Sequence, residues 1–392
     1  MPTAINTGNT AFLLISAALV FFMTPGLALF YAGLVVRSRD VLGIMMQVII
    51  SVGIVTIIWV LFGFGLAFGG DVAGVIGNVS FEGLSTIGRL PGPISAPSVP
   101  LLAYFSFEVM FAIITPALIT GAFADRLNLG RYLILLTGFS IFIYLPVAHW
   151  IWGGGFLEQL GVVDFAGGLV VHTTAGMTAL TASLLARGAE PPGQEKQIAR
   201  RRTESIVLVA LGTGILWFGW FGFNAGSAFA ANGLAATAFA NTLIAPSVAM
   251  LIWALIDLAT QSGSHLVDSL TGAVAGLATI TPAAGYVAPW GAVVIGLVGG
   301  VLTYLAVQFR KRRGWDDALD VWGVHGVGGA SGAILVGLVA VAAVNNVSGL
   351  VEGNGRQLLV QLAAAAVVVT YSFFIAWIIL AIIERVLPTR RS

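Results

Sequence analysis

Cysteine is absent from this chain of 392 residues, and charged residues are scarce, since Asp, Glu, Lys and Arg make up only 9% of it. The lack of cysteine excludes disulfides, thiol nucleophiles and zinc sites built on thiolates. The net charge of +1 provides no field that would attract a nucleic acid. Walker, Rossmann, catalytic-triad and metal-ligand spacings are missing as well. We therefore expect no cofactor, no metal, no nucleic-acid partner and no enzymatic activity.

Apolar residues take the place of charge, and 58% of the chain is hydrophobic. Low-charge runs repeatedly exceed the roughly 20 residues that a helix needs to cross a bilayer. The first run is too long for a signal peptide and has no basic segment before it, so we interpret it as a retained span. The predicted fold class is an all-α polytopic membrane protein. Its eleven transmembrane helices are expected at about 10–36, 43–69, 99–124, 131–152, 166–187, 204–223, 237–258, 267–284, 289–309, 322–344 and 357–386.

The basic residues predict the orientation, because Lys and Arg concentrate in cytoplasmic loops. With these spans, Arg89 and Arg356 fall on one side and sixteen basic residues on the other. The N-terminus is therefore predicted outside and the C-terminus in the cytoplasm. The sixteen are Arg37, Arg39, Arg126, Arg131, Arg187, Lys196, Arg200, Arg201, Arg202, Arg310, Lys311, Arg312, Arg313, Arg385, Arg390 and Arg391.

The spans divide into two halves, about 10–187 and 204–344, followed by a final helix at about 357–386, all within a single domain of residues 1–392. An odd number of spans per half inverts the second half relative to the first, as in many transporters.

Two histidines occupy corresponding spans of these halves, His172 in the fifth and His325 in the tenth. Each follows an aspartate, Asp164 eight residues before His172 and Asp320 five residues before His325. An imidazole inside a bilayer is costly without a function or a partner. Either ring alone is explained by a local hydrogen bond, but their matched placement favours a shared pathway. Burial disfavours the charged ring, and two neutral rings can relay a proton or bind a small neutral molecule.

Aromatic residues gather near the predicted outer ends of three spans. Phe107 and Phe111 lie one turn apart and share a helix face, Trp152 precedes three glycines, and Phe223 and Ser227 lie in the sixth span. An aromatic belt at the membrane interface explains such residues. A cation–π site with a hydroxyl acceptor explains them equally well.

Five ordered strings resemble the ammonium transporter family (Amt/Mep/Rh). The resemblance extends over essentially the whole chain, and Trp152 favours the Amt branch over the Rhesus-like branch. The strings are AHWIWGGG (148–155), DFAGGLVVH (164–172), GWFGFNAGS (219–227), ITPAAGYV (280–287) and DVWGVHG (320–326).

The resemblance implies uptake of ammonium or ammonia, with methylammonium as a surrogate, by a homotrimer in the cytoplasmic (inner) membrane with one pore per subunit. It implies that ammonium is recruited at an outer site and deprotonated, and that ammonia and a separately relayed proton then pass the pore. The implied roles are recruitment for Trp152, Phe111 and Ser227, a gate for Phe111 and Phe223 with Phe107 beside them, a twin-histidine pore for His172 and His325, and support of the outer site for Asp164. A helix N-cap is a second role expected for Asp164.

Three departures from the family pattern stand out. Glu108 replaces a usual glutamine, so it is either an attraction for a cation or a carboxyl hydrogen-bonded within the bundle. Asp268 replaces a small residue and is interpreted as a helix cap, with a modulating role on the cytoplasmic side as the alternative. The chain stops at ERVLPTRRS, where relatives usually continue into a tail that responds to PII-type regulators. The tail is either naturally short or truncated after Ser392, which puts regulation by PII-type proteins in doubt. An ammonium sensor whose output domain is missing is the alternative function.

Overall fold

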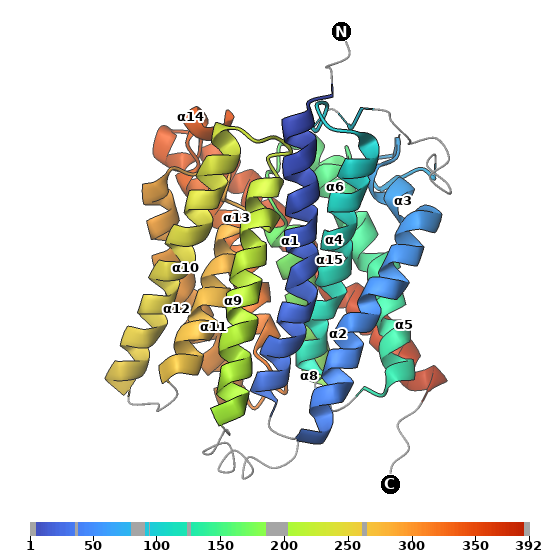
Figure 1. The fold of residues 1–392 in the computed structure, drawn as a ribbon, viewed down its shortest axis with the longest axis vertical. Helices are drawn as coiled ribbons and strands as arrows, with labels where there is room; N and C mark the ends of the chain where they lie inside the picture. The colour runs from blue at the N-terminus through green and yellow to red at the C-terminus, as the bar shows by residue number, and fades with distance from the viewer. Residues whose placement is uncertain are drawn as a thin grey trace.

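The computed structural model describes residues 5–35, 38–79, 91–93, 95–123, 127–185, 203–260 and 265–387, which form a bundle of long helices running between two faces (Figure 1). We name the end of the bundle at which α1 begins the N-terminal face, and the end at which α15 finishes the C-terminal face. The first half contains α1 (Thr7–Leu34), α2 (Ser38–Ile58), η1 (Trp59–Gly63), α3 (Phe64–Phe68), β1 (Asp71–Val72), β2 (Ile76–Gly77), α4 (Leu101–Ile119), η3 (Thr120–Ala122), α5 (Leu129–Phe139), η4 (Ser140–Tyr144), α6 (Leu145–Trp152), α7 (Phe156–Gln159), η5 (Gly168–Thr173) and α8 (Thr174–Leu185). The rest contains α9 (Thr203–Gly226), α10 (Gly233–Thr260), α11 (His265–Ile280), α12 (Pro289–Arg313), η7 (Trp322–Val327), α13 (Gly328–Val339), α14 (Ala342–Asn345), η8 (Leu350–Glu352) and α15 (Gly355–Val386).

Ten helical segments of the described chain are long and apolar enough to cross a membrane. The predicted all-α polytopic fold is confirmed. The eighth predicted span corresponds to α11, an apolar helix of 16 residues that packs against α10 and α12. Because the chain turns at residues 281–287, α11 ends earlier than the prediction of residue 284.

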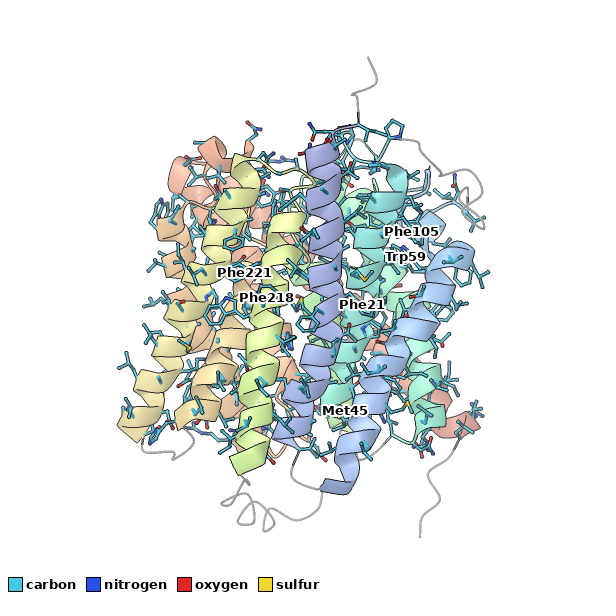
Figure 2. The ribbon with its side chains drawn as sticks, viewed as in Figure 1. Phe21, Met45, Trp59, Phe105, Phe218 and Phe221 are labelled. Carbon is cyan, nitrogen blue, oxygen red and sulfur yellow. The ribbon has the colours of Figure 1, made fainter. Side chains whose placement is uncertain are left out.

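The outer surface of the bundle is apolar, as a lipid environment requires. Phe21 of α1 and Phe218 of α9 are 44% and 56% exposed, and Figure 2 shows both on the near face of the bundle. Trp59 and Phe105 instead join η1 to α4, with ring centroids 6.3 Å apart.

The two halves cross at glycines beside the histidines. Gly176 of α8 lies so close to Gly326 of η7 that a methyl group on Gly176 would come within 2.2 Å of the Gly326 Cα. At the second crossing, a methyl group on Gly329 would come within 2.3 Å of the carbonyl oxygen of Gly168. Small residues permit such close backbone approach in membrane helices. The crossings place η5 and η7, which carry the histidines, side by side.

The described basic residues segregate as the sequence predicts. Arg131 begins α5, and its guanidinium pairs with Glu384 at the end of α15 at 3.0 Å, so both helix ends lie on the C-terminal face. Arg310 to Arg313 end α12 on that face too, and Arg385 lies in the last turn of α15, whereas Arg356 lies at the start of α15. The remaining basic residues of the prediction lie outside the described residues, as does the side chain of Arg39; they are Arg37, Arg89, Arg126, Arg187, Lys196, Arg200, Arg201, Arg202, Arg390 and Arg391.

Candidate functional site

A cavity of about 580 Å³ opens within the N-terminal face. Five of the residues singled out in the sequence line it, although they come from four separate parts of the chain. They are Glu108, Phe111, Trp152, Asp164 and Ser227. We refer to it as the outer cavity.

The indole of Trp152 is held in place by the loop that leads into η5. Its Nε1 donates a hydrogen bond to the carbonyl oxygen of Asp164 at 2.8 Å. The carboxylate of Asp164 in turn accepts bonds from four successive amides, those of residues 167–170, at 2.7 to 3.2 Å. This is the helix cap expected for Asp164, and it also holds the carbonyl that orients Trp152. Since the carboxylate is used by the amides, Asp164 supports the cavity rather than supplying a free ligand.

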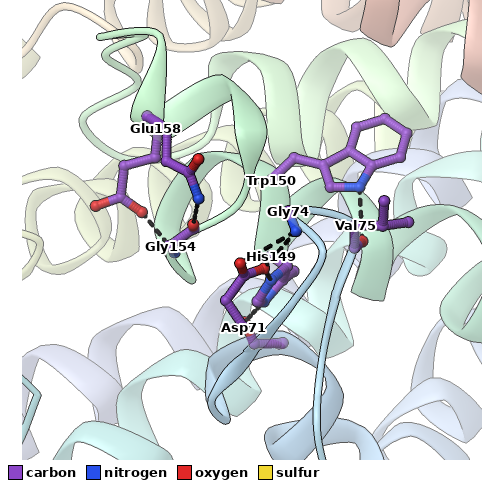
Figure 3. A network of polar contacts seen from close by, with 9 residues as sticks. Asp71, Gly74, Val75, His149, Trp150, Gly154 and Glu158 are labelled. Carbon is purple, nitrogen blue, oxygen red and sulfur yellow. Dashed lines mark hydrogen bonds and ion pairs between the residues drawn. The ribbon is translucent and has the colours of Figure 1, made fainter.

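The helix that carries Trp152 is fastened to the β1–β2 hairpin by a buried histidine (Figure 3). His149 places Nδ1 3.0 Å from the carbonyl oxygen of Ala67 and Nε2 2.9 Å from the carboxylate of Asp71. Both partners are acceptors, so only a ring protonated at both nitrogens can donate to both. The hydrogen bond with His149 holds the pKa of the Asp71 carboxyl below its usual range. The next residue, Trp150, donates to the carbonyl oxygen of Val75 at 2.8 Å.

A continuous file of rings leads from the outer cavity into the bundle. The rings of Trp152 and Phe111 meet edge to face, with centroids 6.1 Å apart. Phe111 lies over Phe223 at 4.1 Å, and Phe223 lies 6.1 Å from His172. Phe107 lies beside Phe111 at 4.8 Å. Phe111 and Phe223 are 1% and 0% exposed, so the file is closed between them.

The histidines form the inner end of this file. The rings of His172 and His325 stack with centroids 5.2 Å apart and planes 24° apart. Among the described residues, neither nitrogen of His172 and not Nδ1 of His325 has a hydrogen-bond partner. Buried polar atoms are rarely left without partners, so a small hydrogen-bonding guest is the natural complement. A cavity of about 10 Å³ between Phe223 and the histidines is about the size of one water molecule.

Trp220 completes the inner site and was missed by the sequence analysis. Its ring stacks on His172 at 5.3 Å, and its Nε1 donates to Thr281 Oγ1 at 2.9 Å. The signal that could have indicated it is the three-residue spacing to Phe223, which places both rings on one helix face. Phe229 is a second missed residue: it lines the outer cavity from a left-handed backbone conformation, with φ at 52°.

The structure corrects the aspartate that was paired with His325. The cap of η7 is Asp317, which accepts bonds from the amides of Val321 and Trp322 at 3.1 and 2.7 Å. Asp320 forms an ion pair with Arg310 at 2.7 Å instead. Asp317 stands eight residues before His325, the same separation as Asp164 from His172. The equal spacing was the signal to follow, because each carboxylate must reach the first free amides of its own helix.

Replacing Asp317 with asparagine is expected to remove a pH-dependent part of the stability. Burial, reinforced by the charge of Asp320, raises the pKa of the Asp317 carboxyl to about 6. The folded protein thus binds this proton more tightly than the unfolded chain, so the stabilisation is complete below about pH 4 and is lost as the pH rises through about 6. The melting temperature in detergent should fall over this interval in the wild type and fall less in Asp317→Asn. Parallel pH profiles for the two proteins would contradict this assignment.

The remaining predicted residues have distinct places. Glu108 is 4% exposed and lines the outer cavity. Asp268 lies in the first turn of α11 at the C-terminal face. The helix dipole stabilises a negative charge in the first turn of a helix. In the described part of the chain, no cluster of three His, Cys, Asp or Glu residues is arranged to hold a metal ion.

Comparison with known proteins identifies this arrangement. A family model described as "Ammonium Transporter Family" matches residues 11–392. The chain belongs to the ammonium transporter family. It is 44% identical over 380 residues to a putative ammonium transporter of Methanothermobacter thermautotrophicus, covering 96% of this chain and 91% of that protein. It is 39% identical over 388 residues to the ammonium transporter of Bacillus subtilis, covering 98% and 94%.

Solved structures show the same fold. The crystal structure of Saccharomyces cerevisiae Mep2 superposes with a TM-score of 0.90 at 32% identity, covering 98% of this chain and 89% of that one. A structure titled "Sensor Amt Protein" gives a TM-score of 0.87 at 28% identity, covering 98% and 95%. This member of the ammonium transporter family is therefore a multi-pass membrane transporter, and its more similar curated relatives carry transporter names.

Proposed function

We propose that this protein takes up ammonium or ammonia through a pore that begins in the outer cavity and passes the paired histidines. The observation that carries the proposal is the single file of rings from Trp152 through Phe111 and Phe223 to His172 and His325. It connects a cavity that suits a hydrated cation to a cavity the size of one small molecule.

Recruitment of the cation follows from the chemistry of the outer cavity. The faces of Trp152 and Phe111 attract a cation through their quadrupoles. The hydroxyl of Ser227 donates to the carbonyl oxygen of Phe223 at 2.9 Å, so its own lone pairs remain available to an N–H donor. Asp164 holds Trp152 in position. Methylammonium fits the same interactions and would serve as a surrogate.

Passage beyond the gate favours the neutral molecule. The closed contact between Phe111 and Phe223 leads to a cavity lined almost entirely by apolar side chains, and an intact ion in such surroundings carries a large desolvation cost. We propose that ammonium loses its proton at the gate and that ammonia passes. The nitrogens of His172 and His325 that lack partners then bind ammonia and relay the proton separately.

The cellular arrangement is proposed from the charge distribution and the family resemblance. We place the protein in the cytoplasmic (inner) membrane, with the N-terminal face outside and the basic C-terminal face in the cytoplasm. We further propose a homotrimer with one pore per subunit, surrounded by lipid.

The test is transport by the purified wild-type protein in proteoliposomes. An ammonium gradient should drive both uptake of ammonium or labelled methylammonium and an inward current, and empty liposomes serve as the control. Ammonium binding without uptake and without current would instead identify a sensor and overturn the transport proposal.

A further inference from the structure

The outer cavity contains one buried carboxyl group with an unused oxygen. Glu108 lies on α4 one turn before Phe111, and only 4% of its surface is exposed. Within the described residues, its Oε2 has no hydrogen-bond partner and the side chain takes part in no ion pair. A buried acceptor without a partner is costly, so a hydrogen-bond donor or a cation is the natural complement of this oxygen.

The other two carboxylates of the outer cavity already accept hydrogen bonds from backbone amides. Asp164 accepts four backbone amides. Glu158 accepts the amide of Gly154 at 2.7 Å. No lysine or arginine is among the described residues that line the cavity. Glu158 is exposed, so Glu108 is the buried acidic group of the cavity that has an oxygen without a hydrogen-bond partner among the described residues.

The surroundings of Glu108 are suited to a donor that carries positive charge. Tyr104 lies one turn before Glu108 on α4 and lines the same cavity, and its hydroxyl group can accept as well as donate a hydrogen bond. The ring of Phe111, one turn along the same helix face, lines the cavity beside it. Aromatic faces attract a cation without fixing its direction, whereas a carboxylate oxygen accepts a hydrogen bond along a defined direction.

We propose that Glu108 is an anionic ligand of the outer cavity, accepting a hydrogen bond from an ammonium or alkylammonium cation held against the rings. The proposal rests on the proposed transport of ammonium and deepens it. It makes affinity at the outer cavity depend on the pairing of this carboxyl group with the bound cation, in addition to the aromatic faces. It also favours hydrogen-bond-donating cations over neutral amines at the entry step.

The deciding variant is Glu108→Gln, which preserves shape and one acceptor but removes the charge. We expect the KM for methylammonium uptake in proteoliposomes to rise about 10- to 100-fold, the range set by loss of a charge–charge attraction at close range in a partly screened cavity. Maximal uptake should change little, because the gate and the histidines are intact. Glu158→Gln is the matched control: it removes a carboxylate from the same cavity, but one already bonded to Gly154, and its KM should stay within about twofold of the wild-type value.

Two results would overturn the proposal while the wild type transports normally. One is an unchanged or lowered KM in Glu108→Gln. The other is an equal rise in KM in both variants, which would mean that only the general field of the cavity matters. Melting temperatures of the three proteins are compared first, and Glu108→Asp, which keeps the charge, should retain more affinity than Glu108→Gln. Absence of uptake in the wild type would reject the proposed function itself, so the two failures are distinguishable.

Discussion

Replacing both His172 and His325 with alanine is expected to abolish or alter the ammonium-driven current of the reconstituted protein. The two rings stack at 5.2 Å and provide the polar atoms at the inner end of the ring file. Without them the small cavity behind Phe223 is lined by apolar groups and the indole of Trp220, so a proton has no carrier across this stretch. Current and labelled methylammonium uptake should be measured in the same proteoliposome preparation, and the current should fall more than the uptake.

A matched control separates the loss of imidazole from the loss of volume. Leu216→Ala enlarges the same cavity but leaves both histidines in place, so its ratio of current to uptake should remain that of the wild type. Wild-type current and ion selectivity in the double histidine variant would contradict a proton relay through these rings. The histidine rings would then serve only as a steric lining of the small cavity.

Substituting alanine for Gly176 is expected to disrupt the crossing of the two halves. The added methyl group would come within 2.2 Å of both Cα and N of Gly326. Because the obstacle is backbone, no side-chain rotation relieves it, and the helices must separate next to His325. Overpacking of this kind costs about 1–3 kcal/mol and sometimes more. We expect a lower melting temperature in detergent, less folded protein on gel filtration, and loss of most transport.

Gly214→Ala provides the comparison, since a methyl group at Gly214 of α9 would meet nothing within 4 Å. Alanine there should leave the stability unchanged or raise it by about 0.4–1 kcal/mol, because alanine lowers the conformational entropy of the unfolded chain. If Gly176→Ala melts and transports like Gly214→Ala, the halves can separate at little cost. Close contact between α8 and η7 would then be unnecessary for the pore.

Several features of this protein could be predicted from the sequence because they depend on length and composition along the chain. Ten of the eleven predicted spans are long apolar helices in the described structure, since the thickness of a bilayer sets a minimum run of apolar residues. The start of α5 and the end of α12 carry basic residues and lie on one face. The order of spans and loops along the chain is enough to predict this. The family resemblance then indicated Trp152, Phe111, Ser227, His172 and His325, and the structure places these residues along the outer cavity and the ring file.

Other features depend on contacts between distant segments. The orientation of the Trp152 indole is set by its hydrogen bond to the carbonyl oxygen of Asp164. His149 fastens its helix to the hairpin because its ring hydrogen-bonds with Asp71. Trp220 belongs to the inner site because its ring stacks on His172 from another helix. The amino-acid sequence gives the spacing of these residues along the chain but not the helix crossing angles that bring them together.

The sequence by itself determined the membrane class, the segregation of charge and the pair of intramembrane histidines. Hydrophobic length and charge order are properties of the chain before it folds. Only the tertiary structure decided that Asp317 rather than Asp320 caps the helix of His325, and that Glu108 retains an unused oxygen in the outer cavity. A carboxylate is assigned to a helix end, an arginine or a guest by which donors lie within about 3 Å of it, and that is set when the halves pack together.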